Sequence, residues 1–302
     1  MKLLFFGTSD FSRPVFEALK EEGYFPILWD LNNSLEDFKK LNPDICIIAA
    51  YGKIVPKEYL DIPKHGFLNI HPSLLPKYRG ASPIQAAILN GDEQTGVTII
   101  LMDEKIDHGP ILAKSKIQQR FPASQRRPGF ARVPLQAGNL RRAMTNDKKY
   151  EELEKELAEL GAKLLIETLP RWIKGEIKPA EQNHDEATYT KKFSWQDGKI
   201  NWSKSAQEVN RQIRALNPEP GTWTTWHDKV LKIIEAKIYE EQPYHKHDKV
   251  YIGVVYEENK RVFVPSSIGH IEPLKVQLEG GKILSIKDFL NGHKDFIGSK
   301  LT

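Results

Sequence analysis

Short apolar runs alternate with helix-like segments through the first hundred residues. The apolar runs end at glycine, proline or polar residues and occupy residues 2–7, 25–29, 44–50, 67–73 and 96–102. Segments 14–23 and 83–91 lie between these runs and carry the spacing of helices. The third run, DICIIAA, is apolar on both faces, as expected of a parallel strand covered by helices. This alternation predicts an α/β fold with an open, doubly wound, mostly parallel sheet over residues 1–190.

Residues 151–169 show the clearest amphipathic helix pattern in the chain. Leu153, Leu157, Leu160 and Leu164 follow an i, i+4, i+7, i+11 spacing, while Glu and Lys fill the other faces. Such a stripe is typical of packing surface. We therefore assign these leucines to the core and not to a functional site.

The pattern changes after residue 200. Short strand-like runs separated by turn residues cover 230–239, 249–256, 261–265 and 273–280, with a helical segment at 205–216. Many short strands with turn signals indicate a small β-barrel-like domain. We therefore predict an α/β domain at 1–190 and a C-terminal β-barrel-like domain at 200–302, joined by a linker near 178–192.

Composition narrows the class of protein only slightly. The chain has 302 residues, a formal net charge of +4 and a single cysteine, Cys46, inside the apolar run ICIIAA. A lone cysteine in such a run predicts a buried thiol and a reducing compartment. The N-terminus lacks the pattern of a signal peptide, and no apolar run approaches the ~20 residues of a membrane span. We expect a cytoplasmic protein, and a monomer.

The segment 118–146 differs from the rest of the chain. It contains no Asp, Glu or Lys and holds six arginines, Arg120, Arg126, Arg127, Arg132, Arg141 and Arg142. One interpretation is a basic loop that contacts RNA. The other, which we favour, is an insertion or a locally frame-shifted coding sequence that is arginine-rich by chance.

The block 68–112 carries the candidate chemistry. Asn69 and His71 lie two residues apart on a predicted strand, so they share a face at its C-terminal end, where open α/β sheets bind ligands. Asp107 follows the next strong strand in a glycine-flanked loop, and we expect it at the same edge. An amide that donates to an oxyanion, an imidazole that moves protons and a carboxylate that orients it suit acyl transfer. On spacing alone, a structural hydrogen-bonded histidine is the alternative.

Other kinds of site are disfavoured by the sequence. Ser73 lacks a G-x-S-x-G context, and Cys46 is predicted to be buried. His65, His71 and His108 lack the i, i+4 spacing of a helical zinc site. The first strand ends in FGTSDF instead of G-x-G-x-x-G, which argues against a nucleotide cofactor. Direct transfer between two bound substrates is the simplest mechanism.

The same block resembles the folate-dependent formyltransferases, and within that superfamily it is most similar to the methionyl-tRNA formyltransferases. The matching motifs are FFGTSDFS at 5–12, AAYGKIVP at 49–56, NIHPSLLPKYRG at 69–80, MDEKIDHGPIL at 102–112, DGKINW at 197–202, IRALNPEPGTW at 213–223 and FLNGH at 289–293. The resemblance therefore covers both predicted domains and most of the chain.

The resemblance implies transfer of a formyl group from 10-formyltetrahydrofolate, the formyl-donor co-substrate, to the amino group of initiator methionyl-tRNA, in support of translation initiation. It places the catalytic trio at Asn69, His71 and Asp107. Asn69 and His71 would stabilise the oxyanion, and Asp107 would hold His71 charged and relay the amine's proton. The implied folate-binding residues are Ser73, Leu74, Leu75, Pro76, Met102 and Asp103. No metal is expected.

Two departures from the family pattern keep alternatives open. Residues 27–44 connect the second strand almost directly to the third. Compared with the family pattern, several tens of residues are missing here, including the basic loop that binds the acceptor stem in the family. The arginine-rich segment falls where the family has a strand and a short link. One alternative is a formyltransferase acting on a nucleotide-linked amino sugar, and another is a catalytically disabled homologue that binds folate or RNA. Candidate RNA contacts in the C-terminal part are Lys204, Arg211, Arg214, Lys229 and Lys232. The alternative is that these residues form a solvated, salt-bridged surface.

Overall fold

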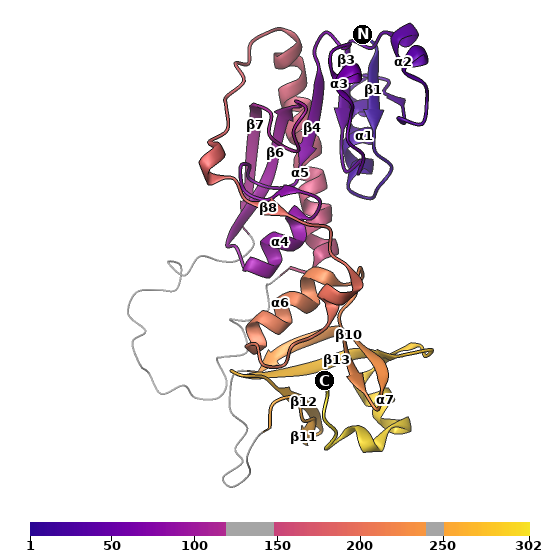
Figure 1. Ribbon diagram of the computed structural model, residues 1–302, viewed down its shortest axis with the longest axis vertical. Coiled ribbons are helices and arrows are strands. Elements are labelled where there is room, and N and C mark those ends of the chain that lie inside the picture. Colours follow the sequence, from indigo (N-terminus) through magenta and orange to yellow (C-terminus); the bar gives the residue numbers. More distant parts are fainter. Residues whose placement is uncertain (119–147, 240–250) are drawn as a thin grey trace. The chain divides into compact units, whose positions relative to one another are not determined.

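A computed structural model of the protein describes residues 1–118, 148–239 and 251–302 (Figure 1). The chain divides into two compact units. The first unit contains Met1–Ala87 and Asp92–Lys192, and the second contains Phe193–Thr302 together with Ile88–Gly91. Apart from Gln118, the predicted arginine-rich insert lies outside the described residues.

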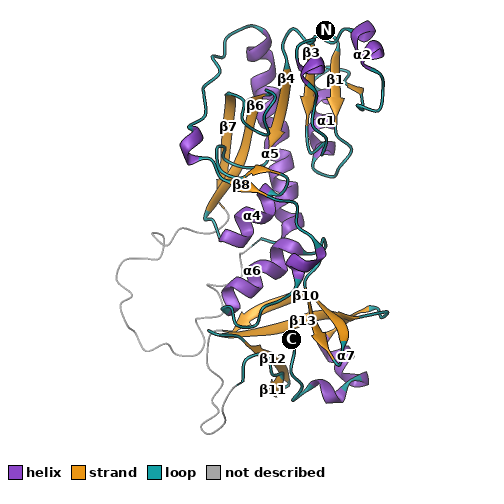
Figure 2. Ribbon diagram, viewed as in Figure 1, coloured by secondary structure: helices purple, strands orange, loops and turns teal. Residues whose placement is uncertain are grey.

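The first unit is built on a six-stranded sheet (Figure 2). Its strands, in spatial order, are β2 (Ile27–Leu28), β1 (Leu3–Phe6), β3 (Ile45–Ile48), β4 (Phe67–His71), β6 (Gln94–Leu101) and β7 (Ile111–Gln118). The pairs among β2, β1, β3 and β4 are parallel, whereas β6 and β7 are antiparallel additions. The predicted α/β fold with a mostly parallel sheet is confirmed, and β3 is buried on both faces as expected. Strand β1 is buried in the same way.

The helices that pack on this sheet are α1 (Ser12–Glu21), α2 (Leu35–Leu41), α3 (Lys57–Leu60) and the long α5 (Tyr150–Ile173). Helix α4 (Pro83–Asn90) lies between β5 (Arg79–Gly80) and β6 in the chain. Helix α5 contacts α1, β4, β6 and β7. Among the described residues, no helix has both the length and the apolar character needed to cross a bilayer.

The buried face of α5 is rotated away from the predicted leucine stripe. Leu153 and Leu157 are fully buried, but Leu160 and Leu164 lie at the margin of the buried face and are half-buried. Helix α5 lies close to the sheet at Gly161, where an added Cβ would lie 2.8 Å from Cγ2 of Ile70. Small residues do not stand out in a hydrophobic pattern, so the leucine spacing identified only part of the buried face of α5.

The second unit is a separate antiparallel sheet with its own apolar core. Its strands are β9 (Trp223–Trp226), β10 (Lys229–Tyr239), β11 (Tyr256–Glu258), β12 (Arg261–Pro265), β13 (His270–Leu278) and β14 (Ile283–Ser285), and its helices are α6 (Ala206–Leu216) and α7 (Ile286–Gly292). The prediction of a β-rich C-terminal unit is confirmed. The expected strand at 249–256 is wrong over 251–255, where the chain turns at Gly253 with a φ of +78°.

The predicted linker 178–192 packs against the first unit. It contains a short 3-10 helix (His184–Glu186) and the strand β8 (Tyr189–Thr190), which pairs in parallel with β5 (Arg79–Gly80). Gln182 from this segment is 5% exposed. A polar composition suggested a linker, but the polar side chains are used for hydrogen bonds inside the unit.

Candidate active site

Strand β4 presents two polar side chains on one face of the sheet. Asn69 and His71 alternate with Leu68 and Ile70, which are buried, and Ile70 faces Gly161 of α5. Because successive strand residues point to opposite faces, Asn69 and His71 point away from α5. The sequence pattern alone was sufficient to predict this shared face.

Asp107 reaches the same place by a route that the sequence did not predict. Strand β6 runs antiparallel to β4, and Leu101 at its end pairs with Leu68 at the start of β4. Asp107 follows a strand as expected, but the expectation that this strand ends at the C-terminal edge of β4 is wrong. The loop 102–110 instead turns back, with Leu101 N donating to Pro110 O at 2.9 Å, and carries Asp107 to Asn69.

The three predicted catalytic side chains converge on one carboxylate oxygen. Asn69 Nδ2 donates to Asp107 Oδ1 at 3.0 Å, and His71 Nδ1 lies 3.5 Å from the same oxygen. The other oxygen, Oδ2, accepts a hydrogen bond from the backbone N–H of Gly80 at 2.8 Å. The His71 and Asp107 side chains are only 5% and 12% exposed. The trio thus occupies a nearly buried position.

The backbone fixes how His71 presents its two nitrogens. His71 Nε2 lies 2.9 Å from the carbonyl oxygen of Tyr78, and a carbonyl can only accept, so Nε2 carries hydrogen. Nδ1 is then the ring nitrogen that faces Asp107. Because Asp107 Oδ2 is bonded to Gly80, Oδ1 is the carboxylate oxygen shared by the amide and the imidazole.

The loop after β4 is held from inside the protein. Ser73 is fully buried and its Oγ donates to Lys77 O at 2.6 Å. Leu75 is also buried, and its backbone N–H donates to Oγ1 of Thr98 at 3.1 Å. The Ser73 hydroxyl is therefore used within the loop, and the Leu75 backbone N–H ties the loop to β6.

Leu74 and Pro76 of the same loop are half-buried and present apolar surface. Gly96 of β6 makes room for the first of them, since an added Cβ there would lie 2.7 Å from Cδ2 of Leu74. Lys114 of β7 donates to the carbonyl oxygen of Leu75, and burial lowers the pKa of its ammonium group.

Met102 and Asp103 begin the loop that carries Asp107. The Met102 side chain packs against an apolar cluster, and its backbone N–H donates to Phe67 O at 2.8 Å. Asp103 Oδ2 lies 2.6 Å from His108 Nδ1, so that carboxylate braces the loop across five residues. Any backbone contact with a bound ligand must come from atoms other than the Met102 N–H.

Cys46 is a buried residue of β3, as predicted, and burial raises the pKa of its thiol. A thiol held in its neutral form is a poor nucleophile. Within the described ranges, no three His, Cys, Asp or Glu side chains are arranged to hold a metal ion.

Two further residues lie next to the trio, Arg79 and Gln182, and sequence reasoning missed both. Arg79 is part of the motif KYRG but was assigned no role, and Gln182 fell within the supposed linker. Gln182 Nε2 donates to the backbone carbonyl oxygen of Asp107 at 2.9 Å, and its Oε1 accepts from Arg79. A contact across 75 residues has no signal in local periodicity.

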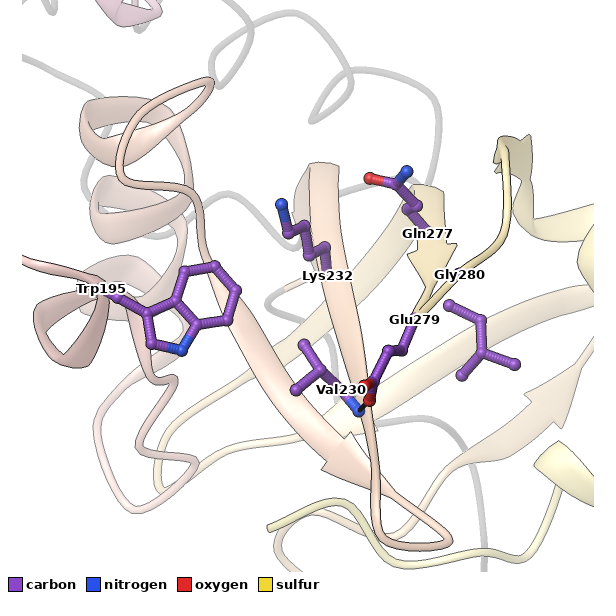
Figure 3. Close-up of a pocket in the computed structure, with 7 residues that line it drawn as sticks. Trp195, Val230, Lys232, Gln277, Glu279 and Gly280 are labelled. Atoms are coloured by element: carbon purple, nitrogen blue, oxygen red, sulfur yellow. Dashed lines mark hydrogen bonds between the residues drawn. The ribbon is translucent and has the colours of Figure 1, made fainter.

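The second unit has a hollow of about 290 Å³ beside an exposed tryptophan (Figure 3). Trp195, Lys232, Gln277 and Glu279 are among its lining residues. The Lys232 ammonium lies 5.2 Å from the centre of the Trp195 ring, and that ring stacks on Trp223 at 5.1 Å. This surface combines a cation with a flat aromatic face.

The other candidate RNA contacts of this unit differ in exposure. Lys204 and Lys229 are exposed, whereas Arg211 and Arg214 of α6 are half-buried. Arg214 Nε donates to Asn210 Oδ1 at 3.0 Å, which ties it to its own helix.

Two family models match the chain. "Formyl transferase" matches residues 4–120, and "Formyl transferase, C-terminal domain" matches residues 192–294. The two matches fall on the sheet that carries the trio and on the antiparallel sheet of the second unit.

Curated relatives are similar over most of their length. The methionyl-tRNA formyltransferase of Thermodesulfovibrio yellowstonii is 36% identical over 263 residues, covering 87% of this chain and 75% of the relative. That of Caldanaerobacter subterraneus subsp. tengcongensis is 32% identical, covering 97% of both chains. Its alignment runs over 334 positions, more than the 302 residues of this chain, so the relative contains residues that have no counterpart here.

Among solved structures, HypX from Aquifex aeolicus in complex with tetrahydrofolic acid has a similar fold, with a TM-score of 0.68 at 18% identity. The match covers 98% of this chain, which spans about half (48%) of the HypX chain. The family models and the identity to curated relatives lead to one conclusion: the chain belongs to the methionyl-tRNA formyltransferase family.

Proposed function

We propose that this protein transfers the formyl group of 10-formyltetrahydrofolate to the amino group of initiator methionyl-tRNA. The observation that carries the proposal is the convergence of Asn69, His71 and Asp107 on a single, nearly buried carboxylate oxygen. Family membership supports the choice of acceptor, since the relatives are named methionyl-tRNA formyltransferases. A nucleotide-linked amino sugar as acceptor is not favoured by these relatives.

The residues present fit a formyl donor. The Asn69 amide carries two N–H groups, and its bond to Asp107 uses one of them, so the second can donate to a carbonyl oxygen. The half-buried Leu74 and Pro76 offer apolar surface to the ring system, with Asp103 at the start of the Asp107 loop as a polar contact. When bound, 10-formyltetrahydrofolate would supply the formyl carbon that the amine attacks.

Each member of the trio has a separate task in direct transfer. Asn69 donates its second N–H to the oxygen that becomes negative in the tetrahedral state. His71 donates to the same oxygen from Nδ1 as the imidazolium that Asp107 is proposed to stabilise, because its Nε2 hydrogen is engaged by Tyr78. Asp107 accepts the proton of the attacking amine on Oδ1, directly or through water, because its Oδ2 is bonded to Gly80. The tetrahedral state then loses the bond between the formyl carbon and the donor nitrogen, and the proton held by Asp107 passes to that nitrogen, so that tetrahydrofolate leaves. No covalent enzyme intermediate is needed.

The test is formyl transfer from 10-formyltetrahydrofolate to methionyl-tRNA by wild type, Asn69→Ala and His71→Ala. Loss of one oxyanion donor is expected to lower kcat by about 100- to 1000-fold. Asn183→Ala, at an exposed position of the first unit, is the control and should retain activity. If Asn69→Ala and His71→Ala both keep the activity of the wild type, the assigned roles are contradicted. A wild type that is inactive on methionyl-tRNA would contradict the proposed function.

The acceptor RNA is proposed to contact the second unit at the Trp195 hollow. The exposed part of the Trp195 indole can contact a base, and the Lys232 ammonium beside it can neutralise a phosphate. Affinity for the tRNA should then fall steeply with salt, and Lys232→Ala should make the log–log slope shallower by about one unit. Wild-type binding that does not respond to salt would contradict this contact.

A further inference from the structure

Arg79 is a buried guanidinium whose hydrogen-bond acceptors are neutral groups. It is 1% exposed, and its Nη2 donates to Gln182 Oε1 at 2.8 Å and to His184 Nδ1 at 2.8 Å. Its Nη1 donates to the Tyr189 hydroxyl at 3.3 Å. Across residues 1–118, 148–239 and 251–302, no carboxylate lies within ion-pair distance of Arg79. A desolvated charge without a counter-ion lowers stability, so the arrangement implies a role beyond folding.

Gln182 connects this guanidinium to the loop that carries Asp107. Its Oε1 accepts from both Nη2 and Nε of Arg79, at 2.8 and 3.3 Å. Its Nε2 donates to the backbone carbonyl oxygens of Asp107 at 2.9 Å and Gly109 at 2.7 Å. A side-chain amide suits this position because it carries an acceptor and two donors on one planar group.

The backbone of Asp107 needs such support. Its φ of +48° is left-handed, a conformation that is costly for residues other than glycine and persists where the surroundings impose it. Gln182 bonds the carbonyl oxygen of this same residue. At the other end, the N–H of Gly80, which directly follows Arg79 in the chain, bonds Asp107 Oδ2 at 2.8 Å. Asp107 is therefore held through both its backbone and its carboxylate.

We propose that Gln182, oriented by the buried guanidinium of Arg79, is a positioning residue that fixes Asp107 for the transfer reaction. This inference rests on the catalytic role proposed for Asp107. Gln182 acts through the backbone of Asp107, and it sets where Oδ1 lies relative to Asn69 and His71.

Gln182→Glu separates positioning from folding. The new carboxylate keeps an acceptor for Arg79 and gives it a charged partner, so the buried guanidinium stays satisfied. It also removes both N–H donors and directs an oxygen at the carbonyl groups of Asp107 and Gly109, which repels the loop. We expect kcat to fall on the order of 100-fold, as for an angstrom-scale misplacement of a reacting group, with KM for both substrates little changed.

Gln94→Glu is the matched control. It makes the same glutamine-to-glutamate change at an exposed residue that begins β6, at the opposite end of that strand from the Asp107 loop. It therefore adds the same negative charge to the first unit without contacting the loop. Wild-type kcat in Gln94→Glu, beside a low kcat in Gln182→Glu, shows that geometry and not added charge is responsible. An equal loss in both variants overturns the proposal.

A double-mutant cycle distinguishes positioning from general damage. If Gln182 acts through Asp107, then Gln182→Glu has no further effect on the residual rate of Asp107→Ala. A loss of the same factor in both backgrounds shows that Gln182 supports the fold alone, and that result overturns the proposal.

The amide proton of Gly80 gives a readout that needs no catalysis. Because this N–H is bonded to the Asp107 carboxylate, we expect its NMR resonance to lie downfield, and Asp107→Ala should remove that shift. Gln182→Glu should move the Gly80 resonance in the same direction, whether or not the wild type transfers formyl groups. An unchanged Gly80 resonance refutes the positioning role. A wild type without transfer activity refutes the proposed function and leaves this measurement to decide the inference.

Discussion

Gly161 of α5 sets the distance between this helix and the strand that carries Asn69 and His71. An added Cβ would lie 2.8 Å from Cγ2 of Ile70, closer than carbon atoms pack. Ile70 is 1% exposed and β-branched, so its methyl group cannot swing aside cheaply. Gly161→Ala would gain about 1 kcal/mol of helix propensity, but overpacking a buried site costs about 1–3 kcal/mol. The steric effect should therefore dominate, with a net destabilisation of roughly 1 kcal/mol.

Hydrogen exchange of peptides from β4 and α5 measures this loss in the first unit without interference from the second. Gly292→Ala is the matched control, because Gly292 ends α7 with nothing within 4 Å of an added Cβ. It should be neutral or slightly stabilising in its own unit. Removing the clash with Ile70→Ala should reverse the sign, so that Gly161→Ala stabilises in that background. Faster exchange on adding Gly161→Ala to Ile70→Ala would refute the steric reasoning.

Three further predictions follow from burial and exposed aromatic surface. Burial lowers the pKa of His270 below its ordinary 6.5, so the unfolded chain binds more protons than the folded one near this pH. The stability of the second unit should therefore fall as the pH drops below about 6.5. In unfolding measured between about pH 5 and 8, His270→Gln should remove that part of the pH dependence. Cys46 should resist a thiol reagent in the native state and react once urea unfolds the chain; fast native labelling would contradict its burial. Trp195→Ala should weaken tRNA binding by about 1–3 kcal/mol in a filter-binding assay, with circular dichroism unchanged; unaltered affinity would remove the hollow from the RNA surface.

Much of the candidate site could be predicted because its first two members are local in sequence. The alternation along β4 put Asn69 and His71 on one face, and the structure shows Leu68 and Ile70 buried on the other. The motif around Asp107 matched the family, although the route by which its loop returns to Asn69 could not be deduced from it. The polar segment around Gln182 was interpreted as a linker because polar composition does not distinguish solvent from internal hydrogen bonds.

The sequence by itself determined the alternating elements of the first unit, the change to short strands after residue 200 and the shared face of Asn69 and His71. These features follow from periodicity within one segment, where each residue's direction depends only on its neighbours. Only the tertiary structure decided that β6 runs antiparallel to β4, that Asp107 returns to the trio in a left-handed conformation, and that Gln182 holds it there. Strand direction and hydrogen bonds between distant segments depend on contacts between parts of the chain that are far apart in sequence. Hydrophobic spacing within one segment does not specify either of them.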